Sequence, residues 1–145
     1  MDTPTLPKRV PEAAVVGAKA SFSRTFTEAD TALFIGITWD VNPYHTNEVF
    51  ASQTRFEHRI IPGLLTVSLF THMGGLWAFL ATSMKFEFAA PVYVGDTITA
   101  EMEVIEADQD RGWVRLRARG TNADGLEVVR GEVAGYPGSF EAWSG

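Results

Sequence analysis

The pattern of apolar and polar residues changes from strand-like to helix-like near the start of the chain. Residues 20–26 alternate apolar and polar side chains, which predicts a strand. Thr27 has the side chain of a helix N-cap, and the acidic Glu28 and Asp30 follow where the helix dipole favours negative charge. We therefore expect a helix over residues 28–37. Its expected apolar face consists of Ala29, Ala32, Leu33, Phe34 and Ile37.

A second and longer helix is predicted over residues 64–80, the longest apolar run of the chain. Apolar side chains surround this helix on almost every side, so other parts of the structure must cover it. Pro62 and Gly63 are typical of the junction between a loop and a helix. Gly74 and Gly75 each weaken the helix by about 1 kcal/mol relative to alanine, which favours close approach of another backbone there.

From Phe86 onward the pattern has the period of two that is typical of strands. The predicted strands cover residues 92–104, 114–119 and 127–134. Residues 108–112 and 122–125 have the composition of hairpin turns, which makes neighbouring strands antiparallel. The sheet needs an apolar layer on one face, and the long helix needs a cover. The predicted fold is therefore of the α+β class, with an antiparallel sheet wrapped around the central helix.

The composition fits one globular domain over residues 1–145, with an extended lead-in over residues 1–16. At 145 residues, 46% hydrophobic and 21% charged, the chain is long enough to bury about two thirds of its unfolded surface. The net charge of −6 argues against a general nucleic-acid binder, although local cationic side chains suffice for a small anionic ligand. The absence of cysteine excludes disulfides, thiolate metal sites and a cysteine nucleophile.

We expect a cytoplasmic protein that does not cross a membrane. The lead-in contains Pro4, Pro7 and Pro11 and has no continuous apolar core, unlike a secretory signal. Hydroxyl and imidazole side chains interrupt the apolar run of residues 64–80, which suits a buried helix better than a membrane span. The lack of cysteine agrees with a reducing compartment.

The strongest indication of chemistry is the segment Asp40-Val41-Asn42-Pro43-Tyr44-His45, which places a carboxylate and an imidazole five residues apart. Pro43 lacks an N–H and disfavours helical angles at Asn42. We therefore expect a bent loop that presents Asp40 and His45 from its two ends. Carboxylate and imidazole suit a general base and a general acid that act on one substrate. An ordinary Asn-Pro turn with a surface histidine has the same sequence and is the alternative.

Three blocks of the chain together resemble the MaoC-like (R)-specific enoyl-CoA hydratases, a family with the hot-dog fold. Residues 40–45 are similar to its D-x-N-P-x-H motif, and residues 56–65 to the strand and loop that lead into its central helix. Residues 86–97 are similar to its strand followed by a Pro-x-x-x-Gly-Asp turn. The resemblance extends over roughly residues 26–134. One position differs, since Pro62 stands where many members have histidine, which indicates an altered substrate preference or a subfamily difference.

The resemblance implies a hydro-lyase that adds water reversibly, on one face, to trans-2-enoyl thioesters to give (R)-3-hydroxyacyl thioesters, or that catalyses the reverse dehydration. Residues 27–53 would form an overhang that carries Asp40 as the base and His45 as the proton donor. The Gly63 N–H, at the start of the long helix, would bind the thioester oxygen. A simple hinge between loop and helix is the alternative role of Gly63. The substrate would be a coenzyme A thioester, without a further cofactor or a metal, and the protein would form a homodimer or a larger homo-oligomer.

Further residues are candidates for substrate binding, each with a plainer alternative. They are Asn42, Arg55, Arg59, Thr71 and Lys85. The amide of Asn42 and the hydroxyl of Thr71 would line the site, or bond to the nearby backbone instead. The three cations would bind the phosphates of coenzyme A, or would remain solvated surface charge. Of the remaining histidines, we expect His58 at the surface and His72 in or beside the core.

Two other classes of function stay open at this point. Hot-dog proteins include acyl-CoA thioesterases, and a fold does not fix a function. A thioesterase usually takes its carboxylate from another part of the fold, so the intact D-x-N-P-x-H block favours the hydratase. The third class is a non-catalytic protein that binds acyl thioesters. The products separate them, because hydration keeps the thioester, hydrolysis releases a thiol, and binding does neither.

Overall fold

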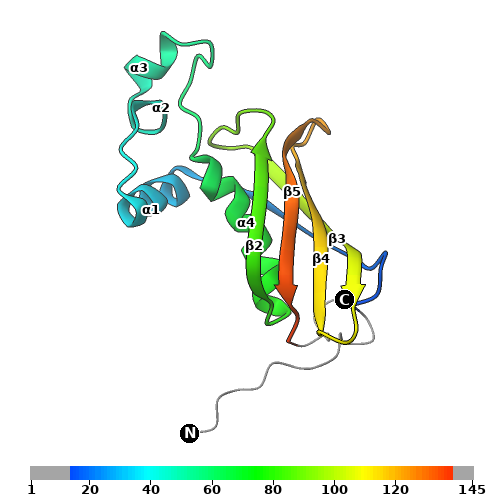
Figure 1. Ribbon diagram of the computed structural model, residues 1–145. Helices are drawn as coiled ribbons and strands as arrows, with labels where there is room; N and C mark the ends of the chain where they lie inside the picture. The colour runs from blue at the N-terminus through cyan, green and yellow to red at the C-terminus, as the bar shows by residue number, and fades with distance from the viewer. Residues whose placement is uncertain (1–13, 139–145) are drawn as a thin grey trace, which may run out of the picture.

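The computed structural model describes residues 14–138, so most of the predicted lead-in lies outside the described residues. The first half contains β1 (Lys19–Thr25), α1 (Glu28–Thr38), α2 (Pro43–Thr46), α3 (Glu48–Ser52) and α4 (Gly63–Leu76). The second half contains β2 (Leu80–Phe88), β3 (Thr97–Asp108), β4 (Trp113–Thr121) and β5 (Glu127–Tyr136). Helices α1, α2 and α3 form an overhang beside one end of the sheet (Figure 1). Within the described residues, no helix is long and apolar enough to cross a membrane.

All five strands join one antiparallel sheet in the order β1-β3-β4-β5-β2, and α4 lies along one of its faces (Figure 1). The buried core forms between them. It contains Leu69, Phe70, Met73 and Trp77 from the helical side, and Ile98, Val104, Leu116 and Val133 from the sheet. This arrangement confirms the predicted α+β fold, a sheet wrapped around a central helix. Burial of these large apolar side chains is the main source of stability.

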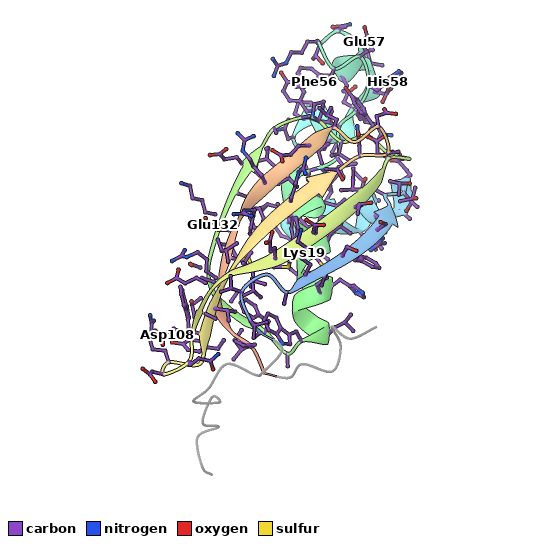
Figure 2. All side chains as sticks on the ribbon, turned by 90° about the vertical axis from the view of Figure 1, so that its right-hand side faces the viewer. Lys19, Phe56, Glu57, His58, Asp108 and Glu132 are labelled. Atoms are coloured by element: carbon purple, nitrogen blue, oxygen red, sulfur yellow. The ribbon has the colours of Figure 1, made fainter. Side chains whose placement is uncertain are left out.

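The opposite face of the sheet carries charges of alternating sign. One row crosses every strand in register and consists of Lys85, Glu132, Arg117, Glu103 and Lys19. Figure 2 labels Lys19 and Glu132 on this face. Glu103 accepts a hydrogen bond of 3.2 Å from Arg117 and lies 3.8 Å from the Lys19 ammonium group. Such exposed cross-strand pairs contribute at most about 1 kcal/mol each, so the row specifies strand register more than it adds stability.

The central helix is shorter than predicted, because α4 ends at Leu76 instead of residue 80. Ala78 adopts a left-handed φ of 50°, and the Phe79 N–H bonds back to the Gly74 carbonyl at 2.8 Å. The chain therefore reverses, and Leu80 already begins β2. Apolar residues continue without a break through this reversal, so hydrophobicity alone does not mark the end of the helix.

The strand predicted to begin at residue 92 begins only at Thr97. Residues 92–94 lie in the loop before it, where Tyr93 forms a single bridge with Ile60. The Asp96 carboxylate accepts the Tyr93 N–H at 2.9 Å, and Gly95 has a φ of 94°. This turn explains the error, because a short apolar alternation also occurs in a tight loop whose side chains reach the core.

Helix α1 begins as predicted, but of its expected apolar face only Phe34 packs against the core of its own chain. The Thr27 hydroxyl accepts the Asp30 N–H and the Asp30 carboxylate accepts the Thr27 N–H, which makes a complete capping box. Leu33 and Ile37 are 68% and 79% exposed, whereas Thr31 is buried. The helix projects away from the sheet, so only its Thr31 side meets the rest of the chain (Figure 1).

We predict that Gly131→Ala strongly destabilises the protein. A Cβ atom at this position in β5 would lie 2.0 Å from the Lys85 carbonyl oxygen of β2, a backbone atom that cannot move away cheaply. The free energy of unfolding should fall by about 2–4 kcal/mol, measured by urea denaturation. Gly36→Ala is the matched control, because among the described residues no atom beyond the neighbouring backbone of its own helix lies within 4 Å of its Cβ position. That change in helix α1 should be neutral or stabilising by up to about 1 kcal/mol, and equal effects of both changes would contradict the close contact.

Candidate active site

A cleft of about 490 Å³ opens where the overhang meets the start of α4. Residues from the overhang, from the loop before α4 and from the end of β2 line it. The polar and charged ones are Thr38, Asp40, His45, Arg55 and Thr66, and Gly63 contributes its backbone. The cleft thus brings Gly63 together with Asp40 and His45, which lie 23 and 18 positions earlier in the sequence. Figure 2 labels Phe56, which also lines the cleft, at this end of the molecule.

Helix α2 positions His45 within the cleft. The Asn42 side chain caps this helix by accepting the Tyr44 N–H at 3.1 Å, and Pro43 occupies its first turn. The prediction of a bent loop over residues 40–45 is therefore wrong for its second half, which is helical. Proline is tolerated in a first turn because its missing N–H would have no partner there. As a result His45 sits on a short helix and is only 9% exposed.

The orientation of the His45 ring follows from a single hydrogen bond. Its Nδ1 atom lies 2.8 Å from the Ile60 carbonyl oxygen. A carbonyl only accepts, so Nδ1 must carry the proton and donate it. In the neutral ring this leaves the lone pair on Nε2, the nitrogen that faces Asp40. The ring therefore presents Nε2 to the cleft.

Asp40 lies on the open side of the same cleft. Its Oδ2 atom is 3.6 Å from His45 Nε2, and its side chain is 45% exposed. Its Oδ1 atom accepts the Asn42 N–H at 3.3 Å, which holds the carboxylate in place. At 3.6 Å the two functional atoms are too far apart for a direct hydrogen bond of normal length. Both atoms are therefore open to a third group between them, such as a water molecule or a substrate.

Gly63 brings the N-terminus of α4 to the cleft. The N-cap residue Pro62 has no side-chain donor or acceptor, and among the described residues no protein atom accepts the Gly63 N–H. The first N–H groups of a helix attract anionic oxygen, because they are unpaired and lie at the positive end of the helix dipole. A Cβ atom here would lie 2.7 Å from the Phe88 ring, so glycine allows this ring to close against the helix start.

Of the predicted binding residues, the structure brings only Arg55 to the cleft. Its guanidinium group lies 4.8 Å from the centre of the Phe56 ring. Asn42 caps α2, and the Thr71 hydroxyl donates to the Ser68 carbonyl at 2.6 Å, so both follow the backbone-bonding alternative. Lys85 lies on the charged outer face of the sheet.

Arg59 belongs to an ion-pair network and not to the cleft. Its guanidinium group donates to both Glu28 oxygens at 2.9 and 2.8 Å and to Glu48 at 3.1 Å. These hydrogen bonds raise the pKa of Arg59, and the pair donated to Glu28 is the largest cause. The bond from Arg59 lowers the pKa of Glu28, and the bond from His58 is the main cause of the lowered pKa of Glu48. The network ties α1 and α3 to the strand-like segment before α4.

Phe88 and Thr66 are among the cleft residues that were not identified as site residues from the sequence. Phe88 at the end of β2 closes against Gly63, and Thr66 lies one turn further along α4. The spacing offered a signal for Thr66, because residues three apart on a helix share a face. No comparable signal exists for Phe88, since its position depends on the pairing of β2 with β5.

Comparison with known proteins places the chain in a family. Residues 12–123 match the MaoC like domain, so the chain belongs to this family, as the sequence motifs predicted. An (R)-specific enoyl-CoA hydratase of Aeromonas caviae is 37% identical over 81% of this chain and 91% of that protein. Its counterpart in Rhodospirillum rubrum is 36% identical over 81% of this chain and 83% of that protein. A solved structure of an (R)-hydratase from A. caviae superimposes with a TM-score of 0.83 and 33% identity, covering 88% of this chain and 99% of the other.

We predict that Glu28→Gln loosens the overhang, because it removes the paired bonds to Arg59. Amide hydrogen exchange in α1 and α3 should become faster, with a loss of up to about 1 kcal/mol in opening free energy, while β3 and β4 stay unchanged. The folded-state pKa of Glu28 is lowered, so its contribution is complete above the unfolded glutamate pKa of about 4.3 and disappears as the pH falls through the lowered value.

Wild type and variant should therefore differ at neutral pH and converge in acid. Glu101→Gln is the control, since within residues 14–138 Glu101 forms an ion pair only with Lys19, at 3.8 Å on the outer face of the sheet. Equal exchange of wild type and Glu28→Gln at neutral pH would contradict a role of this network in holding the overhang.

Proposed function

We propose that this protein is a hydro-lyase that reversibly hydrates trans-2-enoyl thioesters to (R)-3-hydroxyacyl thioesters. The observation that carries the proposal is the pair of Asp40 and His45, whose functional atoms face each other at 3.6 Å beside the unpaired Gly63 N–H. The names of the relatives from A. caviae and R. rubrum support the same reaction. A 3-hydroxybutyryl-CoA dehydratase of Methylorubrum extorquens, 35% identical over 79% of this chain, supports the reverse direction.

In hydration, Asp40 takes a proton from the attacking water while its oxygen bonds to C3 of the substrate. His45, protonated on both nitrogens, gives its Nε2 proton to C2 on the same face of the double bond. The two side chains then hold the same number of protons as before, since Asp40 has gained one and His45 has lost one. The two atoms lie 3.6 Å apart, so a water molecule that contacts both carries that proton from Asp40 to Nε2 and restores the starting state. Each step uses only side chains, water and substrate, so the mechanism needs no cofactor.

The thioester oxygen becomes negative as the bond between C2 and its proton forms or breaks. The Gly63 N–H is the group that binds this oxygen, because it lies at the N-terminus of a helix of 14 residues and no atom of the described part of the chain accepts it. A backbone donor at a fixed position needs no rearrangement during the reaction. Removal of one such donor in other enzymes slows the reaction by about 10²–10³-fold.

Coenzyme A is the proposed carrier, and Arg55 the residue that binds its phosphate groups. Arg55 lines the cleft and is exposed, and it makes no ion pair among the described residues. Its contact with the Phe56 ring holds the guanidinium group at the edge of the cleft. A reducing, cytoplasmic location agrees with this carrier and with a chain that contains no cysteine.

The functional unit is proposed to be a homodimer formed along β2. This strand is at the edge of the sheet, and exposed edges invite pairing with another chain. Large apolar side chains are exposed on it and on the adjoining side of α4. They are Leu64, Leu76, Leu80, Met84 and Phe88. A monomer rarely leaves so many neighbouring apolar groups in water, whereas a second copy would cover them.

The proposed activity is tested by incubating the protein with crotonyl-CoA and following the conjugated thioester absorbance together with free thiol. The absorbance should fall without release of thiol. Asp40→Asn should lower kcat at least about 10³-fold, because an amide cannot accept the proton of water. His45→Asn should lower it similarly while keeping the donor that bonds to Ile60, which protects the fold. Release of thiol would instead identify a thioesterase, and full activity of Asp40→Asn would exclude this mechanism.

We predict that Met84→Lys weakens the dimer. A charge placed on the exposed β2 edge must be desolvated on pairing, so light scattering should report a smaller mass at micromolar concentration. Leu126→Lys is the matched control, because Leu126 is similarly exposed but lies in the turn between β4 and β5. It should leave the mass unchanged. A wild-type protein that is monomeric at this concentration, or equal masses of wild type and Met84→Lys, would contradict pairing along β2.

A further inference from the structure

The buried end of the cleft contains one polar side chain that the proposed mechanism does not use. Thr66 is only 3% exposed and lines the cleft together with the buried Val92 and Val128. Its hydroxyl has no hydrogen-bond partner among the described residues. Other hydroxyl residues of the helices behave differently, because each donates to a carbonyl of its own helix. They include Thr31, Thr38, Ser68 and Thr71.

An unpaired hydroxyl at this place has to find its partner in the cleft. A helical threonine usually satisfies its hydroxyl on the preceding turn, so the state of Thr66 is unusual. Without a ligand, water in the cleft can serve as the partner. A bound ligand displaces that water, and its own chemistry then decides whether the hydroxyl stays paired. Loss of the partner is unfavourable in an environment formed by valine side chains.

The position of Thr66 relative to Gly63 tells which part of a substrate it meets. The two residues are three positions apart in the first turn of α4, so they share one face of the helix. They are separated by about 4.5 Å along the helix axis, roughly the reach of three or four carbon–carbon bonds. With the thioester oxygen at the Gly63 N–H, the acyl chain passes Thr66 beyond C3, the last reacting carbon.

We propose that Thr66 determines specificity, favouring acyl groups that carry a hydrogen-bonding oxygen beyond C3 over plain alkyl chains of the same length. The inference rests on the proposed function, since it takes the thioester oxygen to lie at Gly63. An alkyl chain displaces water from the Thr66 hydroxyl and offers it no hydrogen-bond partner. A hydroxyl on the chain replaces that water directly. Sites that pair a substrate hydroxyl discriminate against analogues without it more strongly than apolar pockets discriminate by size.

The test compares thioesters of coenzyme A that differ only by a hydroxyl in place of a methyl group. One pair is trans-4-hydroxybut-2-enoyl and trans-2-pentenoyl; the other is trans-5-hydroxypent-2-enoyl and trans-2-hexenoyl. For at least one pair, Thr66→Val should lower the ratio of kcat/KM values, hydroxyl over methyl, about tenfold relative to wild type. Intrinsic reactivities cancel in this comparison. Thr66→Ser retains the hydroxyl and should keep the wild-type preference. An unchanged ratio for both pairs in Thr66→Val overturns the inference.

A binding measurement separates this inference from the proposed reaction. The same thioesters are titrated by calorimetry into Asp40→Asn protein, with and without Thr66→Val. An affinity preference for the hydroxyl compound that disappears with Thr66→Val supports the role of Thr66, even where the wild type turns over none of the thioesters. If the thioesters bind with this preference but the wild type does not convert them, only the hydration proposal fails. Equal preferences in both proteins, or no binding of any thioester, overturn the role of Thr66. Melting curves of each variant confirm that it is folded.

Discussion

The site depends on the hydrogen bond from His45 Nδ1 to the Ile60 carbonyl oxygen. This bond connects the overhang to the loop that leads into α4, and it fixes which nitrogen of the ring faces the cleft. The Ile60 N–H in turn donates to the Tyr44 carbonyl at 3.1 Å, so the two segments are held by a reciprocal pair of bonds. Without this connection, Asp40 and His45 would still be near in sequence, but neither would have a fixed position relative to the Gly63 N–H. A catalytic site needs that fixed relation between proton donor, base and anion-binding group.

The overhang and the sheet are stabilised in different ways. The sheet and α4 share a core of large apolar side chains, whereas Leu33 and Ile37 of α1 are exposed and ion pairs connect the overhang to the loop before α4. The network of Arg59 with Glu28 and Glu48 is the most extensive of these. Polar contacts at the surface are weak individually, so the overhang is less stable than the layer that supports it. A chemically active segment with low stability on a rigid support is common in enzymes, because the active segment must admit and release substrate.

Local signals in the sequence identified much of this architecture. The N-cap at Thr27 and the two hairpin turns depend on neighbouring residues, and they were predicted correctly. The bent loop predicted for residues 40–45 is in part the short helix α2. The errors arose at positions whose structure depends on contacts between residues far apart in the sequence. The end of α4 depends on the pairing of β2 with β5, and the exposure of Leu33 and Ile37 depends on how α1 projects from the sheet. Arg59 was misplaced for the same reason, since its partner Glu28 lies 31 positions earlier in the chain.

Phe88 belongs both to the wall of the cleft and to the surface of the proposed dimer. Its ring lies against the start of α4 at the cleft, and it is also half exposed at the edge of the sheet, where the proposed dimer forms. A second copy packed on this edge would limit the rotamers of the ring, and so the shape of the cleft wall beside Gly63. Catalytic efficiency per subunit then becomes a function of protein concentration. Assays at high dilution would sample a looser cleft wall than the crowded interior of a cell provides.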